Sequence, residues 1–381
     1  MNIVFMCGSL EPGRDGVGDY IRRLAAEIGG RGHSVSLLAI NDKHITESLQ
    51  GTQEADGVSM PTLRITADLP TKVRFAHARN WIDLLNADLI SLQFVAFAFH
   101  PKGLSLSLNR NLEYLGRGRS WHIMFHELWV GMADNSNLKL VCWGLIQRQL
   151  IKSLVAKLQP IFVHTQTKLY QLQLADLDVK AAYLPLFSNI PVIRPTNAST
   201  APNTRQVGNE ISLVLFGGIH PSGLVQQFIA EAADIAKANN LHLILRIIGR
   251  GGTNQQHWVS ICESVGLDIE LYGEQSPESI STILSSSSIG ISTTPIALIE
   301  KSGSVAAMRE HGLPVICVRE FWKARGIAGI TPPKGIAEYK LGNLRELLHI
   351  EKSVTKNSVL STVGNKFIAD IHVSSEVKIK K

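Results

Sequence analysis

The chain has 381 residues, of which 45% are hydrophobic and 18% are charged. This length and apolar fraction predict two globular domains or one large one, and they exclude wholesale disorder. Lys and Arg number 38 against 32 Asp and Glu, which gives a formal charge of +6. The excess is mild and not clustered, so it favours anionic small ligands or an anionic membrane surface over nucleic acid.

The amino terminus lacks the pattern of a signal peptide, because its apolar stretch is short and no basic segment precedes it. The longest apolar run, residues 89–99, is far shorter than the ~20 residues that cross a bilayer. The four widely spaced cysteines are predicted to be buried, reduced thiols. We therefore expect a cytoplasmic protein. Residues 139–157 combine a wide apolar face with four basic side chains, so peripheral contact with the inner face of the membrane stays open beside a plain core helix.

Apolar runs typical of strands alternate with helical patterns through the first half of the chain. Strands are predicted at 2–7, 34–40, 89–94, 121–125 and 161–164, and helices at 16–30, 72–86, 109–114 and 138–158. Residues 191–210 break this pattern, because they contain three Pro, many Asn, Thr and Ser, and few apolar residues. Such a composition predicts a linker.

The alternation restarts after the linker. Strands are predicted at 211–216, 241–248, 268–272, 288–292 and 314–318, and helices at 223–238, 255–265, 277–285 and 303–310. Strand–helix alternation with apolar strands is typical of parallel sheets that are covered on both faces. The predicted fold class is therefore α/β, with two doubly wound, Rossmann-like domains facing a cleft. The expected bounds are 1–192 for the amino-terminal domain, 193–210 for the linker, 211–350 for the carboxy-terminal domain, and 351–381 for a helix or tail that can pack back on the first domain.

Ligands of such sheets bind where strands end and helices begin. The first such turn, residues 8–19, contains Gly16, Val17 and Gly18. Its spacing is not the G-x-G-x-x-G of dinucleotide sites, which argues against NAD. A tight turn and a ligand contact stay equally open for this segment.

A second candidate is the Phe-His-Glu triplet that ends the predicted strand 121–125. His126 can hold or move a proton near neutral pH, and the neighbouring carboxylate of Glu127 would raise its pKa. A structural histidine and a functional one stay open. His100 and Lys102 follow another strand end, where acceptor contact and a plain loop are equally open.

The carboxy-terminal half offers two candidate anion sites. Gly217 and Gly218 lie between a predicted strand and helix, in a loop suited to cradle an anion. Arg246 and Arg250 flank the end of the next strand, where they can neutralise a diphosphate or be ordinary surface arginines. The segment Glu300-Lys301-Ser302-Gly303-Ser304 opens a helix, whose first amides suit a phosphate or sugar hydroxyls.

Together these segments resemble retaining glycosyltransferases of the GT-B fold, similar to the glycosyltransferase family 4 group and to its bacterial members associated with surface polysaccharide. The resemblance covers most of the chain. It is carried by GVGDYIRRLAAEIGGRGHSV, FHE, LVLFGGIHPSG, LRIIGRGG, IELYGEQSPESISTILSSSSIGISTTP and EKSGSVAAMREHGLPVI, the last in the region of the family's E-x7-E motif.

The resemblance implies transfer of a hexosyl group from a nucleotide-sugar donor in the second domain to a glycan or lipid-linked acceptor in the first. It implies no metal and no cofactor besides the nucleotide sugar, and it makes His126 and Glu300 the catalytic residues. The implied donor-binding residues are Gly217, Gly218, Arg246, Arg250, Tyr272, Lys301, Ser302, Gly303 and Ser304, and the acceptor-side residues are Gly16, Val17, Gly18, His100 and Glu127.

The sequence departs from the family pattern in two places. The second Glu of E-x7-E falls on Met308, or on Ala307 when counted back from the end of the helix, and Glu310 is about half a helical turn away. The basic residues of the family's Gly-rich loop fall on Gly218 and Ser222. Two alternatives therefore stay open: a module of the same fold that binds without catalysing, and a nucleotide-sugar epimerase.

Overall fold

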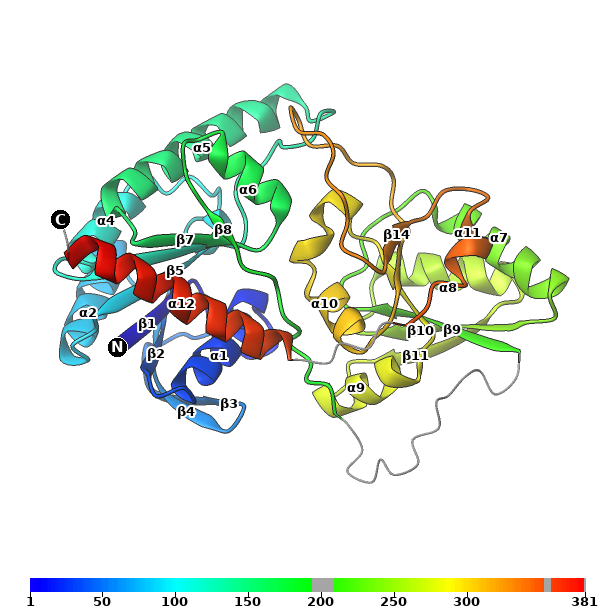
Figure 1. The fold of residues 1–381 in the computed structure, drawn as a ribbon, viewed down its shortest axis with the longest axis horizontal. Helices are drawn as coiled ribbons and strands as arrows, with labels where there is room; N and C mark the ends of the chain where they lie inside the picture. Colours follow the sequence, from blue (N-terminus) through cyan, green and yellow to red (C-terminus); the bar gives the residue numbers. More distant parts are fainter. Residues whose placement is uncertain (194–208, 353–357, 380–381) are drawn as a thin grey trace. The chain divides into compact units, whose positions relative to one another are not determined.

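The computed structural model describes residues 1–193, 209–352 and 358–379. The chain forms two compact units (Figure 1). Unit 1 comprises Met1–Pro185, Ala324–Ala328 and Ser358–Lys381, and unit 2 comprises Leu186–Lys323 and Gly329–Asn357. No helix among the described residues is both long and apolar enough to cross a membrane.

Unit 1 is built on an eight-stranded sheet with the order β3-β4-β2-β1-β5-β6-β7-β8. All neighbouring strands are parallel except the β3–β4 pair. Strands β1 and β5 are buried along nearly their whole length, as expected for strands with both faces covered. The strands are β1 (Asn2–Cys7), β2 (Ser34–Asp42), β3 (Leu49–Ala55), β4 (Val58–Thr66), β5 (Leu89–Phe94), β6 (Ser120–Phe125), β7 (Phe162–Thr165) and β8 (Ala182–Tyr183).

The helices of unit 1 cover both faces of this sheet. They are α1 (Gly16–Gly29), α2 (Thr71–Leu84), α3 (Ala96–Phe99), α4 (Leu108–Leu115), α5 (Leu138–Leu158), α6 (Lys168–Ala175) and the carboxy-terminal α12 (Val359–Ile379). Helix α12, red in Figure 1, packs against α1, and the ring of Phe367 lies 5.7 Å from that of Phe5 in β1. The last helix is therefore part of unit 1.

Unit 2 contains six parallel strands in the order β11-β10-β9-β12-β13-β14. Alternate residues of β9 enter two separate cores, with Leu213 and Leu215 on one face and Val214 on the other. The elements are β9 (Glu210–Phe216), α7 (Val225–Ala238), β10 (His242–Ile248), α8 (Thr253–Val265), β11 (Asp268–Gly273), α9 (Pro277–Ser286), β12 (Ile289–Ser292), the 3-10 helix η1 (Ile296–Lys301), α10 (Gly303–Glu310), β13 (Val315–Cys317), β14 (Ile336–Glu338) and α11 (Leu344–Leu347).

These two parallel sheets confirm the predicted α/β class with two doubly wound, Rossmann-like domains. The β3–β4 hairpin was not predicted. Strand β3 is polar and largely exposed, so it has no apolar pattern. The signal that the sequence does carry is the Asp56–Gly57 pair at the turn, where both residues adopt positive φ.

The units also differ from the predicted bounds in detail. Residues 324–328 belong to unit 1, where Ala324 pairs with Ala133 and the Arg325 amide donates to Met132 O at 2.8 Å. Residues 186–192 belong to unit 2. Residues 194–208, most of the expected linker, lie outside the described residues. Of the four cysteines, Cys142 on α5 is exposed and the other three are buried.

Candidate functional site

The carboxyl edge of the sheet in unit 2 is lined by glycine. Gly217 and Gly249 directly follow β9 and β10, and Gly273 is the last residue of β11; their φ angles are +82°, +126° and +65°. The Gly217 amide donates to Ile248 O at 3.0 Å, and the Gly249 amide donates to Gly273 O at 2.8 Å. Since glycine adopts positive φ without strain, three neighbouring strands end here in bare backbone.

The first turn of α10 lies against this edge. A Cβ added to Gly217 would lie 3.3 Å from Ser304 Cβ, which shows how closely the loop after β9 approaches the helix. Ser302 caps the helix by accepting from the Val305 amide, and its hydroxyl lies 3.0 Å from that of Ser304. A Cβ added to Gly303 would meet only open space. The first amides of a helix have no intrahelical acceptor and carry the positive end of its dipole, so this turn favours an anion.

The loop between β9 and α7 is held from several elements. The His220 amide donates to Thr293 Oγ1 at 2.8 Å, just beyond β12. The Asn254 side chain of α8 donates to Ile219 O at 2.9 Å. Glu320 accepts from the Gly223 amide. The backbone of this loop is thus fixed before any ligand binds.

Three of the predicted donor residues are paired with carboxylates. Arg246 Nε donates to Glu270 at 2.9 Å, and the Tyr272 hydroxyl donates to the same Glu270 oxygen at 2.6 Å. The hydrogen bond from Tyr272, together with Arg246, lowers the pKa of Glu270. Arg250 pairs with Glu274. The positive charge of both arginines is therefore already balanced within β10, β11 and the residue that follows β11.

A cation that the sequence reading missed lies near the glycine loop. Burial, and then the charges of Arg319 and Lys301, lower the pKa of His220. Arg319 follows β13 and pairs with Glu320 at 3.3 Å, and its Nη1 is buried with no hydrogen-bond partner among the residues described. The signal was its position directly after the predicted strand 314–318.

The expected second glutamate has no counterpart on the outer face of α10. Met308 and Ala307 are fully buried, and a Cβ added to Gly290 in β12 would lie 2.5 Å from Met308 Sδ. Glu310 accepts from the Ser188 amide instead. Glu300, the expected first glutamate, lies half-buried in η1.

In unit 1, His126 follows β6 and is only 4% exposed. Its Nδ1 lies 3.0 Å from Gln166 Oε1, its Nε2 lies 2.8 Å from Gln93 Oε1, and the ring packs edge-on against Tyr20. The sequence predicts that Glu127 raises the pKa of this histidine. That prediction is wrong, because burial dominates and lowers the pKa to about 4. His126 is a neutral, fully engaged side chain near pH 7.

The amides at the start of α1 are also engaged. The Asp15 carboxylate accepts from the Val17 and Gly18 amides, both at 2.9 Å. A Cβ on Gly18 would lie 2.8 Å from Ser9 O, so packing alone requires glycine at this position, whereas Gly16 has open space. A carboxylate therefore occupies the place where an anionic ligand would bind.

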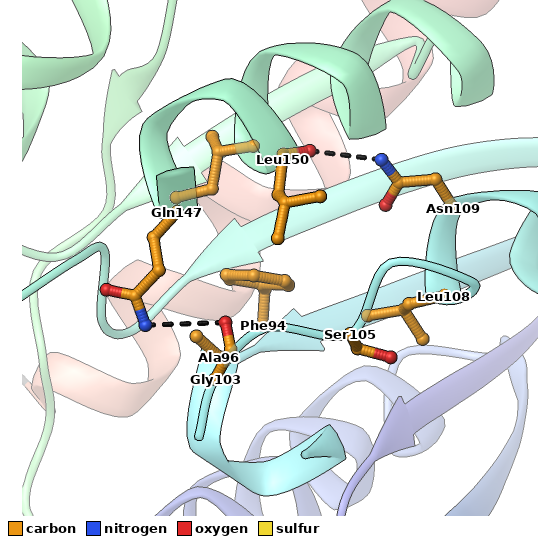
Figure 2. A pocket seen from close by; sticks show the side chains of 9 residues that line it. Phe94, Ala96, Gly103, Ser105, Leu108, Asn109, Gln147 and Leu150 are labelled. Carbon is orange, nitrogen blue, oxygen red and sulfur yellow. Dashed lines mark hydrogen bonds between the residues drawn. The ribbon is translucent and has the colours of Figure 1, made fainter. Parts of the chain in front are cut away.

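His100 caps its own loop, since its Nδ1 accepts from the Lys102 and Leu104 amides at 3.1 and 3.3 Å. A cavity lies beside the same loop (Figure 2). In it the amide of Gln147 donates to Gly103 O, and that of Asn109 donates to Leu150 O. Its volume of about 20 Å³ has room for about one water molecule and is too small for a sugar.

Solved structures with the same architecture decide the fold. The chain is similar over 98% of its length to the catalytic domain of starch synthase IV from Arabidopsis thaliana bound to ADP and acarbose, with a TM-score of 0.60, 13% identity and 99% of that chain covered. It is similar over 99% of its length to the Anabaena protein HepE in complex with UDP and glucose, with a TM-score of 0.55, 14% identity and 95% of that chain covered. The fold is GT-B.

The GT-B fold also occurs in a Listeria monocytogenes structure assigned as a UDP-N-acetylglucosamine 2-epimerase. The chain matches it over 98% of its own length and 96% of the other, with a TM-score of 0.57 and 9% identity. No family model and no curated protein sequence matches the chain. At these identities the likeness establishes the fold and leaves the activity to the site.

Proposed function

We propose that this protein is a glycosyltransferase that transfers a sugar from a nucleotide-sugar donor held by unit 2 to an acceptor held by unit 1. The observation that carries the proposal is the contact between the glycine loop at Gly217 and the first turn of α10 at Ser304. Backbone amides of a loop and a helix start then converge on one place at the carboxyl edge of a parallel sheet. Phosphate groups bind at such places.

The diphosphate of the donor takes its hydrogen bonds from the amides of Gly303, Ser304 and Gly218. The Gly217, His220 and Gly223 amides of the loop already donate within unit 2. Lys301 and Arg319 supply positive charge, since both lie within electrostatic range of His220 in that loop. Arg246 and Arg250, which the sequence put forward, are held by carboxylates. The site thus stabilises the negative charge that develops on the leaving diphosphate with fixed dipoles and cations, without a metal ion.

The chemistry that fits these groups is transfer with retention of configuration. The bond from the anomeric carbon to the diphosphate oxygen breaks, and the acceptor oxygen bonds to the same face of that carbon. The acceptor proton passes to the departing phosphate oxygen. His126 is not needed as a base, in keeping with its pKa of about 4 and its two engaged nitrogens. We assign His126 to shaping the acceptor side and Glu300 to sugar hydroxyls.

The acceptor in this proposal is a glycan or lipid-linked sugar that reacts through a hydroxyl, as in bacterial surface-polysaccharide synthesis by family 4 enzymes. The start of α1 supports a neutral acceptor group, because Asp15 already binds its amides. A cytoplasmic location with contact at the inner membrane face belongs to the same proposal. Helix α5 exposes Leu138, Leu145 and Ile146, each by 47% or more.

The experiment is a screen of the full-length protein against common nucleotide sugars. A true donor present at 100 times its dissociation constant adds about 2.7 kcal/mol of stability and raises the melting temperature. Slow release of the free nucleoside diphosphate without acceptor then indicates a transferase. Release of an altered nucleotide sugar indicates an epimerase. Binding without turnover, which the buried Met308 favours, indicates a module that only binds. The absence of any stabilising nucleotide sugar would overturn the proposal.

A further inference from the structure

A continuous line of hydrogen-bonded polar side chains crosses the interior of unit 1 from His126 to the carboxy-terminal helix. It starts just after β6, passes through β5, back through β6 and through β7, and ends on α12. We call its interior members, Gln93, Ser91, His122 and His164, the relay. The links are His126 Nε2 to Gln93 Oε1 at 2.8 Å, Gln93 Nε2 to Ser91 Oγ at 2.8 Å, Ser91 Oγ to His122 Nδ1 at 2.8 Å, His122 Nε2 to His164 Nδ1 at 2.9 Å, and His164 Nε2 to Asp370 Oδ2 at 2.9 Å.

The relay lies on a face where strands of a covered sheet normally carry apolar side chains. Ser91, His122 and His164 are 0% exposed, and Gln93 is 1% exposed. Phe367 of α12 covers His122, with its ring edge-on at 4.9 Å. A buried polar group costs free energy unless it is hydrogen-bonded, so the relay is stable only while each link is made.

The carboxylate at one end gives every link a single direction. Ionised Asp370 can only accept, so His164 donates from Nε2 and accepts at Nδ1. His122 therefore donates from Nε2, and its Nδ1 accepts from the Ser91 hydroxyl. Gln93 then donates to Ser91, and its oxygen accepts from His126 Nε2. The opposite order would set the lone pair of His164 against a carboxylate.

The charges around the relay support this order. Burial raises the pKa of Asp370, but hydrogen bonds from His164 and Lys366 outweigh it and lower the pKa overall. Lys366 Nζ lies 2.7 Å from the same carboxylate oxygen. Burial lowers the pKa of His164 and His122, so both rings are neutral near pH 7. Asp370 and Lys366 are therefore the two charged groups at this end of the relay.

We propose that Asp370 is a positioning residue for the acceptor side of the site, which acts through the relay to hold His126 as the neutral Nε2–H tautomer. His126 Nδ1 then carries a lone pair, and Gln166 donates to it with its amide rotated by 180°, so that Nε2 takes the place of the Oε1 atom that lies 3.0 Å away. A residue of the carboxy-terminal helix in this way fixes the orientation of two side chains at the carboxyl edge of β6 and β7. Only the functional meaning of that edge rests on the proposed function.

The test is ¹⁵N NMR of the histidine rings in the full-length protein, because ring nitrogen shifts distinguish the two neutral tautomers and the cation. His126, His122 and His164 are expected to be Nε2–H at pH 7. In Asp370→Ala the direction is lost, and all three are expected to become mixtures of tautomers. Asp370→Asn keeps an accepting oxygen that Lys366 still holds, so it should restore the single tautomer. Ser91→Ala should mix His126 and leave His164 unchanged.

Arg31→Ala is the matched control for loosened packing of α12. Arg31 binds the helix at Ser361 and Asn365 without touching the relay, so its loss should leave the three tautomers unchanged. A cationic or Nδ1–H His126 in the unaltered protein would overturn the proposal, as would unchanged shifts in Asp370→Ala. Should that variant fail to fold, Ser91→Ala decides in the same way. Once an acceptor is identified, Asp370→Ala should slow transfer roughly tenfold without changing donor affinity. If the proposed function is wrong, this kinetic effect is lost but the predicted histidine tautomers are unaffected.

Discussion

The two units end their parallel sheets in opposite ways. At the carboxyl edge of unit 1, polar groups are engaged by the protein itself: Asp15 takes the first amides of α1, and two glutamines take the ring of His126. At the same edge of unit 2, a positive-φ glycine ends or directly follows each of three strands, and the short helix α10, capped by Ser302, starts at Gly303 beside the first of these glycines.

The difference indicates that the two units recognise different features of a ligand, its shape in unit 1 and its charge in unit 2. Unit 1 offers a surface whose hydrogen bonds are satisfied internally, which suits a ligand recognised by its hydroxyls and its outline. Unit 2 offers backbone amides and nearby cations, which suit an anion. One architecture can therefore present two different kinds of binding surface through the residues placed at the strand ends.

Acidification should produce the largest difference in stability between the two units. The pKa of His126 is about 4 in the folded chain, below its unfolded value. Between pH 6.5 and 4, His126 is protonated in the unfolded state but not in the folded state. As the pH is lowered through this range, the free energy of unfolding therefore decreases, by roughly 3 kcal/mol from His126 alone. Hydrogen exchange, corrected for its intrinsic pH dependence, should show unit 1 losing protection first. Earlier loss in unit 2 would contradict the buried-histidine explanation.

The same substitution at the first residue of two helices, one in each unit, should affect donor binding very differently. Gly303→Asp and Gly16→Asp both add a side chain into open space at a helix start, where a carboxylate does not disturb the helix. Gly303→Asp should weaken donor binding by about 100-fold, or about 2.7 kcal/mol, through repulsion of the diphosphate. For Gly16→Asp, calorimetric titration should give a dissociation constant for the donor within about twofold of that of the unaltered protein. Equal losses in both variants would remove the distinction between the units.

Arg319 and Arg246 provide a comparison within unit 2. Arg319→Met should weaken donor binding about tenfold, because Arg319 is a cation near the glycine loop whose Nη1 has no partner among the described residues, although its Nε pairs with Glu320. Arg246→Met should change the dissociation constant less than about twofold, since Glu270 and Ser286 already hold that side chain. Titrations of both variants with one donor decide the point. A larger loss of affinity in Arg246→Met than in Arg319→Met would indicate that Arg246 binds the phosphates.

Replacement of His126 should have the smallest effect on the chemistry. A general base contributes about 10² to 10⁴ in rate, whereas a residue that only shapes the acceptor side contributes less. His126→Asn should therefore lower kcat by no more than about tenfold and leave the pH profile without a new limb. Steady-state kinetics over pH 5 to 9 provide the measurement. A loss above a hundredfold would make His126 the base after all.

The sequence predicted what local patterns determine. Apolar runs located the strands, and the glycines and serines at 217 and 302–304 marked segments that the fold brings together. It failed where partners come from distant strands. Glu270 and Glu274, which neutralise the two predicted arginines, follow them by 24 residues along the chain.

The environment of His126 shows the same limit more clearly. Its neighbour Glu127 suggested a raised pKa, but burial lowers the pKa, and the hydrogen bond with Gln166, 40 positions away, offsets only part of that shift. The acid that orders the relay lies 206 positions from His164. Arg319 was missed because its position directly after a predicted strand is its only signal, and many surface arginines share such a position.

Hydrogen exchange of the full-length protein with and without nucleoside diphosphates tests the central claim most directly. UDP and ADP are the first ligands to use, because structures of the same fold contain them. A nucleotide held in unit 2 should slow exchange in residues 217–223 and 302–305 and leave residues 15–19 of unit 1 unchanged. Protection confined to the start of α1, or its absence from both unit 2 segments when a nucleotide is bound, would contradict the assignment of the donor site.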